Sequence, residues 1–387
     1  MIRPTTARVD LRAIQSNYRA IAEHVARERP SQPPGVIAVV KANAYGHGAG
    51  EVARALEHAG ADLLACADIE EGAALRTAGV RARILVFGAL SVSDLDGLFE
   101  FGLTPTISTP SAARAVQAAA ARRNTRVPYH LKIDTGMNRL GFRHDNLRRT
   151  LPEVFASQNL ELEAIYTHFA TADDIESSLF GEQRSRFDDA VRLVGQLRPD
   201  RDPERVALRG AYLHAANSAA LLRDSRVWYD RVRPGLLLYG LVPAPLASTL
   251  PLTPAMSLVS RVVAVKGVRA GEGVGYGVRF TADGPATIAI VPAGYADGLD
   301  LRLAGRGAVL IRGRRAPIVG SVCMDMLMAD VTGLDALPGD EVVIIGSQKL
   351  PNGADDRIDV REMAAAIGTI PYEILSRIGS RIERVYS

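Results

Sequence analysis

The chain has 387 residues, 47% of them hydrophobic, and a formal net charge of +3 at pH 7. This length predicts two domains, and the weak charge, with no run of Lys or Arg interleaved with aromatic residues, argues against a nucleic-acid-binding surface. The two cysteines, Cys66 and Cys323, lie far apart, and no apolar window reaches about 18 residues, so we expect a cytoplasmic protein with no disulfide framework and no membrane segment.

Eight short apolar runs alternate with Ala-rich helical stretches in the first part of the chain. The runs cover residues 36–40, 63–67, 84–87, 104–107, 129–133, 164–168, 211–214 and 226–233. The stretches between them, such as 51–58, 69–78 and 111–122, have the helical composition that crossovers between parallel strands require. The pattern predicts a (β/α)8 TIM-type barrel over residues 10–241, with an open, doubly wound sheet as the alternative.

A change in amino-acid composition marks the end of this predicted barrel. Pro234-Gly235 interrupts the eighth run, and because proline is poorly tolerated in a central strand we expect the strand to end at Arg233; the alternative is that it resumes at Leu236. The chain then becomes proline-rich and later strand-like, with runs at 258–266, 286–291, 307–311, 318–322, 328–331 and 341–345 and one helical stretch at 360–366. Residues 242–387 are therefore predicted to form a mainly β domain.

A single lysine follows the first predicted strand. Lys41 stands in the sequence Val-Val-Lys-Ala-Asn-Ala-Tyr-Gly-His-Gly, directly after the apolar run. Burial disfavours the charged form of a lysine and lowers its pKa, which leaves a neutral amine able to form an imine with a carbonyl compound. The alternative is a lysine that reaches solvent at the end of a strand.

Other candidate side chains fall at the same end of the predicted barrel. Arg139 follows the fifth run, His168 ends the sixth, and Asn217 and Ser218 follow the seventh. Active sites of such barrels lie at the carboxyl ends of the strands, so these residues and Lys41 are expected to line one rim. In an open sheet they would be spread along an edge instead.

Several ordered motifs resemble those of the alanine racemases, over about residues 9–386. Besides the Lys41 segment, the matching motifs are Lys-Ile-Asp-Thr-Gly-Met-Asn-Arg-Leu-Gly (132–141), Thr-His-Phe-Ala-Thr-Ala-Asp (167–173), Ala-Asn-Ser-Ala-Ala (216–220), Arg-Pro-Gly (233–235), Val-Gly-Tyr-Gly (274–277), Gly-Tyr-Ala-Asp-Gly (294–298), Cys-Met-Asp (323–325) and Tyr-Glu (372–373). The resemblance implies an isomerase that interconverts L-alanine and D-alanine on pyridoxal 5'-phosphate (PLP) held by Lys41, supplying D-alanine for peptidoglycan. It also implies that residues 1–9 join the β domain.

The predicted rim offers hydroxyl and backbone donors for a phosphate group. No Walker-type or G-x-G-x-x-G motif occurs, so a small phosphorylated cofactor is favoured over a nucleotide. By resemblance, the phosphate would be held by Tyr45, Ser218, Gly235, Leu236 and Tyr372, and the rest of the cofactor by Lys41, Arg139, His168, Asn217 and Arg233. Taken alone, Ser218 would be a helix N-cap and Gly235 a plain turn.

Three basic residues have further roles that the resemblance implies. Arg233 would face the pyridine nitrogen of the cofactor, and because an arginine stays protonated it cannot give that nitrogen a proton, which disfavours transamination. Its alternative partner is a nearby carboxylate such as Asp230. Arg139 would engage the substrate carboxylate and the cofactor's phenolic oxygen. It would be oriented by Lys132, which matches a position often carbamylated in the family.

Racemisation requires two acid–base groups on opposite faces of the α-carbon. Lys41 is one, and by resemblance Tyr276 is the other, reaching the lysine of a second copy in a head-to-tail homodimer. Because a tyrosine is a poor base at neutral pH, we expect His168 and Arg233 to be the cations that favour its phenolate. Taken alone, Tyr276 would be a surface tyrosine in a glycine-rich turn. Met324 and Tyr372 would limit the substrate side chain to about a methyl group.

Three positions depart from the family pattern. Ser321 stands where many relatives have an arginine, the usual arginine after Gly-Tyr-Ala-Asp-Gly is displaced to Arg302, and Gly275 replaces a serine. Two of them concern the substrate channel, so a racemase for other amino acids, such as serine, is the first alternative. A PLP carrier without turnover and a decarboxylase of the same two-domain plan are further alternatives. The β domain argues against the carrier and Arg233 against the decarboxylase.

Overall fold

The computed structural model describes residues 4–90, 95–198, 210–349 and 355–387. The chain divides into two compact units. One comprises Ala13–Ala42 and Ala49–Pro254 and is termed the barrel unit; the other comprises Met1–Arg12, Asn43–Gly48 and Ala255–Ser387 and is termed the β unit. No helix within the described ranges is long and apolar enough to cross a membrane.

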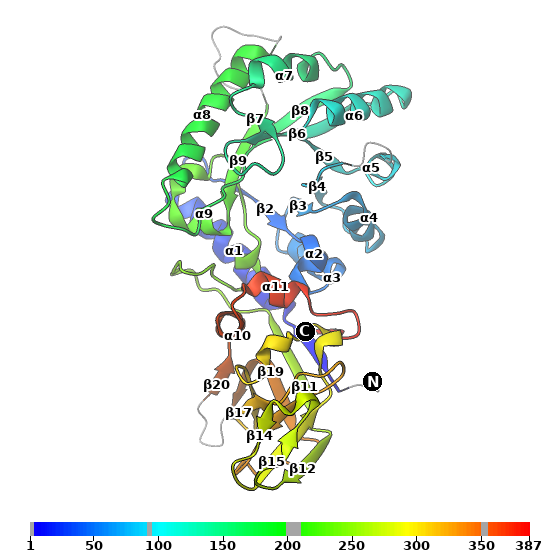
Figure 1. Ribbon diagram of the computed structural model, residues 1–387. Coiled ribbons are helices and arrows are strands. Elements are labelled where there is room, and N and C mark those ends of the chain that lie inside the picture. Colours follow the sequence, from blue (N-terminus) through cyan, green and yellow to red (C-terminus); the bar gives the residue numbers. More distant parts are fainter. Residues whose placement is uncertain (1–3, 91–94, 199–209, 350–354) are drawn as a thin grey trace. The chain divides into compact units, whose positions relative to one another are not determined.

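Eight parallel strands pair into a closed ring in the barrel unit, and Figure 1 shows strands of this unit among its helices. They are β2 (Gly35–Val39), β3 (Leu63–Cys66), β4 (Arg83–Val86), β5 (Thr104–Ile107), β6 (Val127–Asp134), β8 (Leu160–Tyr166), β9 (Tyr212–Asn217) and β10 (Arg231–Arg233). Neighbours pair in this order, and the pairings of β5 with β6 and of β10 with β2 close the ring. The predicted (β/α)8 barrel is confirmed, and the open-sheet alternative is excluded.

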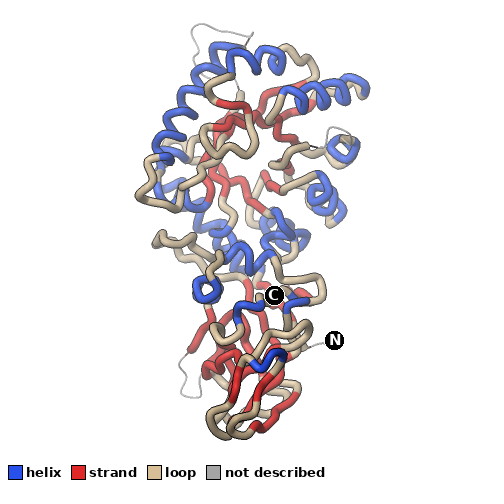
Figure 2. Tube along the Cα trace, viewed as in Figure 1, coloured by secondary structure: helices blue, strands red, loops and turns tan. Residues whose placement is uncertain are grey.

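Helices connect the strands and cover the ring (Figure 2). They are α1 (Leu11–Glu28), α3 (Ala49–His58), α4 (Ile69–Thr77), α5 (Asp96–Glu100), α6 (Pro110–Arg122), α7 (Leu147–Phe155), α8 (Leu179–Leu197) and α9 (Ser218–Arg223), and a short strand β7 (Phe142–Arg143) pairs with β6. Successive residues of a strand point to opposite faces. In β6, His130 and Lys132 therefore share the face that contacts β8 and β9 side chains, whereas Leu131 and Ile133 are buried on the other face.

The eighth strand is shorter than the predicted run 226–233. Residues Ser225–Val227 form a 3-10 helix, η1, so β10 begins only at Arg231. The strand ends at Arg233, as predicted from Pro234. Beyond the proline the chain enters a second 3-10 helix, η2 (Leu236–Tyr239), and does not resume the strand.

The β unit is mainly strands, as predicted. Its ten-stranded sheet has the order β12-β15-β18-β17-β16-β19-β11-β1-β21, with β20 on β19, and β13 and β14 pair separately. The strands are β1 (Thr6–Val9), β11 (Met256–Arg261), β12 (Ala264–Val268), β13 (Gly273–Val274), β14 (Phe280–Thr281), β15 (Ala286–Val291), β16 (Ala308–Ile311), β17 (Arg314–Val319), β18 (Leu327–Asp330), β19 (Glu341–Lys349), β20 (Asp355–Ile358) and β21 (Glu383–Tyr386). Strand β1 pairs with β11 and β21, so the N-terminal segment joins this sheet as the resemblance implied; residues 1–3 lie outside the described residues.

The run predicted at 258–266 is two strands, not one. Strand β11 pairs with β19 and β12 pairs with β15, so the chain changes partner between them. At the change, the Val262 N–H donates to the Asp340 carbonyl and the Val263 N–H to the Ile290 carbonyl, both at 2.9 Å. The predicted helix at 360–366 is α10 (Val360–Ile367), and a further helix, α11 (Pro371–Ser376), was not predicted.

Candidate active site

Lys41 begins a left-handed turn just beyond β2. In this turn, α2 (Lys41–Tyr45), the four residues from Ala42 to Tyr45 all have φ values of 52–54°. A left-handed φ costs an ordinary residue roughly 1–2 kcal/mol, which contacts around the turn must offset. Burial, followed by the charge of Arg139, lowers the pKa of Lys41, whereas the carboxylate of Glu71 raises it. The carboxyl end of β2 thus presents a lysine amine with an increased neutral fraction.

Lys132 points into the ring from β6. It is 5% exposed, and its Nζ lies 5.5 Å from the centroid of the Tyr166 ring. Burial, with the charges of Arg139 and Arg233, lowers the pKa of Lys132 to about 8. Arg139 itself is exposed on the loop between β6 and β7. Because these cations and Lys41 lie close enough to repel one another, the rim favours an anionic ligand.

Arg233 is a buried guanidinium at the end of β10. It is 3% exposed and donates to the carbonyl oxygens of Thr167 and Ala215 and to Nδ1 of His214, each at 2.9 Å. The alternative partner Asp230 instead accepts from the Leu213 N–H at 2.7 Å. Burial lowers the pKa of Arg233 to about 10, so the guanidinium stays protonated at pH 7.

The contact between Arg233 and His214 sets a chain of histidine tautomers inside the ring. A guanidinium can only donate, so His214 Nδ1 accepts and His214 Nε2 carries the proton. His214 Nε2 lies 3.0 Å from Nδ1 of His130, whose Nε2 lies 3.0 Å from the Tyr212 hydroxyl. Burial holds the pKa of both histidines well below the usual value. Two neutral imidazoles therefore fix the orientation of Arg233.

His168 follows β8 and lies among cations. Arg233 donates to its Nδ1 at 3.2 Å. Burial, followed by the charges of Arg233 and Lys132, holds the pKa of His168 well below the usual value. The imidazole is neutral at pH 7, so the prediction that His168 acts as a cation is wrong: a further positive charge in this cluster is unfavourable.

The predicted phosphate residues of the barrel unit meet at one point. Asn217, not Ser218, is the N-cap of α9, because its side chain accepts from the Ala220 N–H at 2.9 Å. The Ser218 hydroxyl instead accepts from the Gly235 N–H at 2.9 Å. This hydroxyl therefore lies beside the backbone that leads into Leu236 and η2.

In the β unit, Tyr45 and Tyr372 lie together. Their ring centroids are 5.9 Å apart and the rings are tilted by 46°. Tyr45 is buried, and burial raises the pKa of its hydroxyl. Tyr372 belongs to α11, so the position of that helix decides where the second ring lies.

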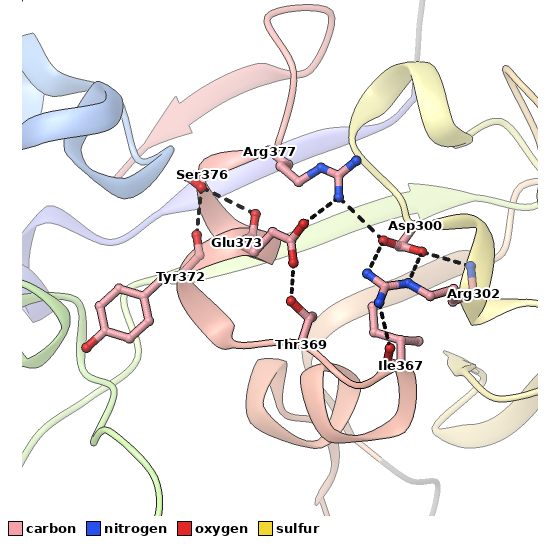
Figure 3. A network of polar contacts seen from close by, with 8 residues as sticks. All are labelled: Asp300, Arg302, Ile367, Thr369, Tyr372, Glu373, Ser376 and Arg377. Carbon is pink, nitrogen blue, oxygen red and sulfur yellow. Dashed lines mark hydrogen bonds and ion pairs between the residues drawn. The ribbon is translucent and has the colours of Figure 1, made fainter. Parts of the chain in front are cut away.

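A network of charged side chains holds α11 within the β unit (Figure 3). Arg377 donates to Glu373 at 2.8 Å and to Asp300 at 3.4 Å. Arg302 donates to both oxygens of Asp300, at 2.9 and 2.8 Å, and to the Ile367 carbonyl at 2.9 Å. The Arg302 hydrogen bonds hold the pKa of Asp300 at about 2, so this carboxylate stays ionised. The displaced arginine of the sequence thus links α10 to the network around α11.

Tyr276 and Met324 are exposed on the β unit, by 78% and 52%. Tyr276 begins the 3-10 turn η3 (Tyr276–Val278) between Gly275 and Gly277, whose φ values are 74° and 70°. Glycine adopts these left-handed values without strain, which explains the glycines on either side of the tyrosine. The Ser321 hydroxyl donates to the Tyr276 carbonyl at 2.7 Å, so this departure from the family pattern supports the turn.

Sequence reasoning missed two residues that contact or support the predicted site residues. Glu71 contacts the turn after Lys41, and the pattern Asp68-Ile69-Glu70-Glu71 predicts the start of a helix but not that contact. His214 supports Arg233 and shares an inward face with His130, which strand alternation could have indicated. Among the described residues, no three His, Cys, Asp or Glu side chains are grouped as metal ligands would be.

The fold and the rim together define a class of protein. A closed parallel barrel with lysines and arginines at the carboxyl ends of its strands, followed by a β unit, is a (β/α)8-barrel enzyme with an appended β domain. Residues 9–243 match the profile of the alanine racemase N-terminal domain, and residues 255–386 match that of the alanine racemase C-terminal domain. The chain belongs to the alanine racemase family, the isomerases that interconvert L-alanine and D-alanine.

Individual alanine racemases match this chain over its whole length. The chain is 41% identical over 391 residues to the alanine racemase of Carboxydothermus hydrogenoformans and 39% identical over 390 residues to that of Desulforamulus reducens, each covering 100% of both chains. A solved alanine racemase from Streptomyces lavendulae has a TM-score of 0.90 at 34% identity and covers 100% of this chain and 98% of that one. The alanine racemase of Bacillus anthracis, solved with bound L-Ala-P, has a TM-score of 0.88 at 36% identity, covering 100% and 96%.

Proposed function

We propose that this chain racemises alanine with PLP held on Lys41, and that Lys41 and Tyr276 of a second copy are its two acid–base groups. The observation that carries the proposal is the Lys41 amine, whose pKa is lowered by burial and by Arg139 at the carboxyl end of the barrel. A neutral amine is the form that attacks a carbonyl group and the form that accepts a proton.

The donors on the rim fit a phosphorylated pyridine cofactor. The Ser218 hydroxyl accepts from the Gly235 N–H and keeps its own proton as a neutral donor for a phosphate, and Gly235, Leu236, Tyr45 and Tyr372 would complete this part of the site. Arg233 would face the ring nitrogen, with His168, Asn217 and Arg139 as the remaining cofactor contacts. When bound, PLP supplies an electron-withdrawing ring that makes the α-proton of alanine acidic.

Two groups would move the α-proton of alanine. Lys41 Nζ would take or return it on one face of the α-carbon, and the Tyr276 hydroxyl would do so on the other. Arg233 stays protonated, so it gives the ring nitrogen no proton, and this favours prompt return of the proton to the α-carbon. Because His168 is neutral, Arg233 is the remaining candidate for the cation that favours the Tyr276 phenolate.

We also propose that Lys132 is carbamylated and orients Arg139 toward the substrate carboxylate. With a pKa of about 8, roughly a tenth of the Lys132 amine is neutral at pH 7, far more than for an ordinary lysine, and the neutral amine is the form that attacks carbon dioxide. The nitrogen–carbon bond forms, a proton is released, and the product carries a negative charge. That charge would lie beside Arg139 and Arg233, where it is stabilised. Native intact-mass measurement should show a labile mass gain that is lost on acidification and is absent from Lys132→Met.

We propose a homodimer with shared sites. The β unit exposes large apolar side chains by 43–78%, which a second copy could bury: Tyr276, Val278, Tyr295, Met324 and Met326. Met324 and Tyr372 would limit the substrate side chain to about a methyl group.

Both cysteines are free thiols, which supports a reducing compartment such as the cytoplasm.

Reduction with borohydride tests the cofactor assignment. The chain has only four lysines, Lys41, Lys132, Lys266 and Lys349, so a covalent adduct can be located without ambiguity. The expected result is a pyridoxyl group on Lys41 after reduction and proteolysis. An adduct on another lysine would refute the proposed cofactor site, and a Lys41→Arg variant should carry none.

A further inference from the structure

Glu71 contacts the backbone at the ends of two neighbouring strands. It is the third residue of α4, whose N-cap Asp68 accepts from the Glu71 N–H at 2.8 Å. A glutamate at this position commonly reaches back to the N–H of the N-cap residue itself. Here one carboxylate oxygen accepts from the Ala67 N–H at 2.7 Å and the other from the Ala42 N–H at 2.6 Å. One side chain thus ties the end of β3 to the residue directly after Lys41.

The hydrogen bond to Glu71 comes from the first residue of the left-handed turn. Ala42 has a φ of 53° and opens the run of left-handed residues that follows Lys41. Inside the turn, the His47 N–H donates to Ala44 and the Gly48 N–H to Asn43, at 3.0 and 2.9 Å. Neither contact anchors the turn at Lys41. The Glu71 bond does so, because it runs to a neighbouring strand of the barrel.

The carboxylate also acts on Lys41 through its charge. Burial and Arg139 lower the pKa of Lys41, whereas Glu71 raises it. Removing the Glu71 charge should therefore increase the neutral fraction of the Lys41 amine at a given pH. The direction of this change distinguishes a lost charge from lost packing. If the variant merely loosened the turn and exposed Lys41, the loss of burial would raise the pKa of Lys41.

We propose that Glu71 is a positioning residue for Lys41: its carboxylate holds Ala42, the first residue of the left-handed turn, beside Ala67 at the end of β3 and so fixes the direction of the lysine side chain. The functional meaning rests on the proposed role of Lys41, but the contact can be tested without it.

Glu57 provides a matched control. It lies on α3, and its carboxylate accepts from the backbone N–H groups of Arg81, at 2.8 Å, and of Ala82, just before β4. This is the same kind of contact at the amino end of a strand. Both N–H groups donate to one oxygen, which a glutamine keeps, so Glu57→Gln removes a comparable carboxylate charge from a helix–strand contact without affecting Lys41.

Two measurements on full-length protein test the proposal. First, amide hydrogen exchange is followed in the holoenzyme. Glu71→Gln should accelerate exchange at residues 42–48, because an amide side chain can accept only one of the two N–H bonds. Glu71→Asp keeps the charge but is one methylene shorter, so it should accelerate exchange in the same segment. Glu57→Gln should leave exchange there unchanged.

Second, the lysines are labelled with trace acetic anhydride after the cofactor has been removed. In Glu71→Gln, labelling of Lys41 relative to Lys266 should rise roughly twofold to fivefold, the range of a partly screened charge pair. The proposal is overturned if exchange at 42–48 and Lys41 labelling both match the wild type, or if Glu57→Gln changes them equally. If Glu71→Gln does not fold, Glu71→Asp decides the test. Exchange at residues 42–48 that is no faster in this variant than in the wild type overturns the proposal. A cofactor adduct on another lysine would refute the proposed function while leaving this result intact.

Discussion

Two lysines share one rim of the barrel, but their surroundings differ. Lys41 is partly exposed and has the Glu71 carboxylate nearby, whereas Lys132 is 5% exposed and lies over the Tyr166 ring among arginines. Burial is the largest cause of a lowered pKa for both. A partly exposed amine can exchange protons with a ligand, while the buried amine can act only on its immediate neighbours, which matches the roles proposed for them.

Replacing Tyr276 by phenylalanine should separate the two directions of racemisation. If Tyr276 takes the α-proton of L-alanine and Lys41 that of D-alanine, solvent deuterium exchange into L-alanine should fall by about 10²-fold or more, the usual contribution of an acid–base group. First-step exchange from D-alanine should be retained much better. Deuterium incorporation measured from each enantiomer checks this, and equal losses in both directions would contradict the assignment.

Lys132 should make the stability of the cofactor-free, carbamate-free protein depend on pH. Its pKa in the folded state, about 8, is below the ordinary value of 10.5. Between these pH values the unfolded chain binds more protons, so the free energy of unfolding rises with pH. The Lys132→Met variant lacks this titration. Its free energy of unfolding, taken relative to that of the wild type, should therefore fall by roughly 2 kcal/mol from pH 7 to pH 10. Urea unfolding at both pH values measures the change, and a constant difference would show that Lys132 titrates normally.

At the scale of elements, α11 is held by the apolar packing of Ile374 and Leu375 and by the charged network around Asp300. Asp300 is the centre of that network, because it accepts from both Arg302 and Arg377. Its partners Arg302 and Arg377 have side chains that are 44% and 54% exposed, so each ion pair contributes modestly. The consequence of losing the network is therefore expected in the position of Tyr372 and less in overall stability.

Asp300→Asn should loosen α11. We expect faster amide exchange at residues 368–377 and a KM for alanine that rises several-fold, with a loss of stability below about 1 kcal/mol. Asp224→Asn is the matched control, because Asp224 accepts from Arg226 in the same local arrangement within the barrel unit. If both variants change KM alike, the network has no particular connection with Tyr372.

Sequence periodicity located the elements better than it located their junctions. All eight barrel strands were predicted, because apolar runs separated by helical stretches reflect burial on a parallel sheet. The break between β11 and β12 was missed, since a change of pairing partner leaves no mark on an apolar run. The left-handed turn after Lys41 was missed because Ala42, Ala44 and Tyr45 do not signal positive φ, and a single asparagine, Asn43, does not predict four such residues in a row. The neutral state of His168 depended on long-range neighbours that local sequence does not reveal.

At the scale of the whole molecule, the proposed pair of bases is divided between the two units. Lys41 belongs to the barrel unit and Tyr276 to the β unit, where it is 78% exposed. If Tyr276 serves the lysine of a second copy, each site is complete only in a dimer, and the isolated subunit should be inactive. Activity should then fall on dilution in step with the dimer fraction, as measured by sedimentation.

Mixing two inactive variants tests the central claim most directly. Lys41→Ala and Tyr276→Phe are each expected to lose racemisation. When equal amounts are unfolded and refolded together, random pairing gives mixed dimers in which one of the two sites has both bases, so activity should recover to about a quarter of wild type. Recovery to that level would support shared sites. No recovery, in a mixture shown to contain mixed dimers, would contradict the account.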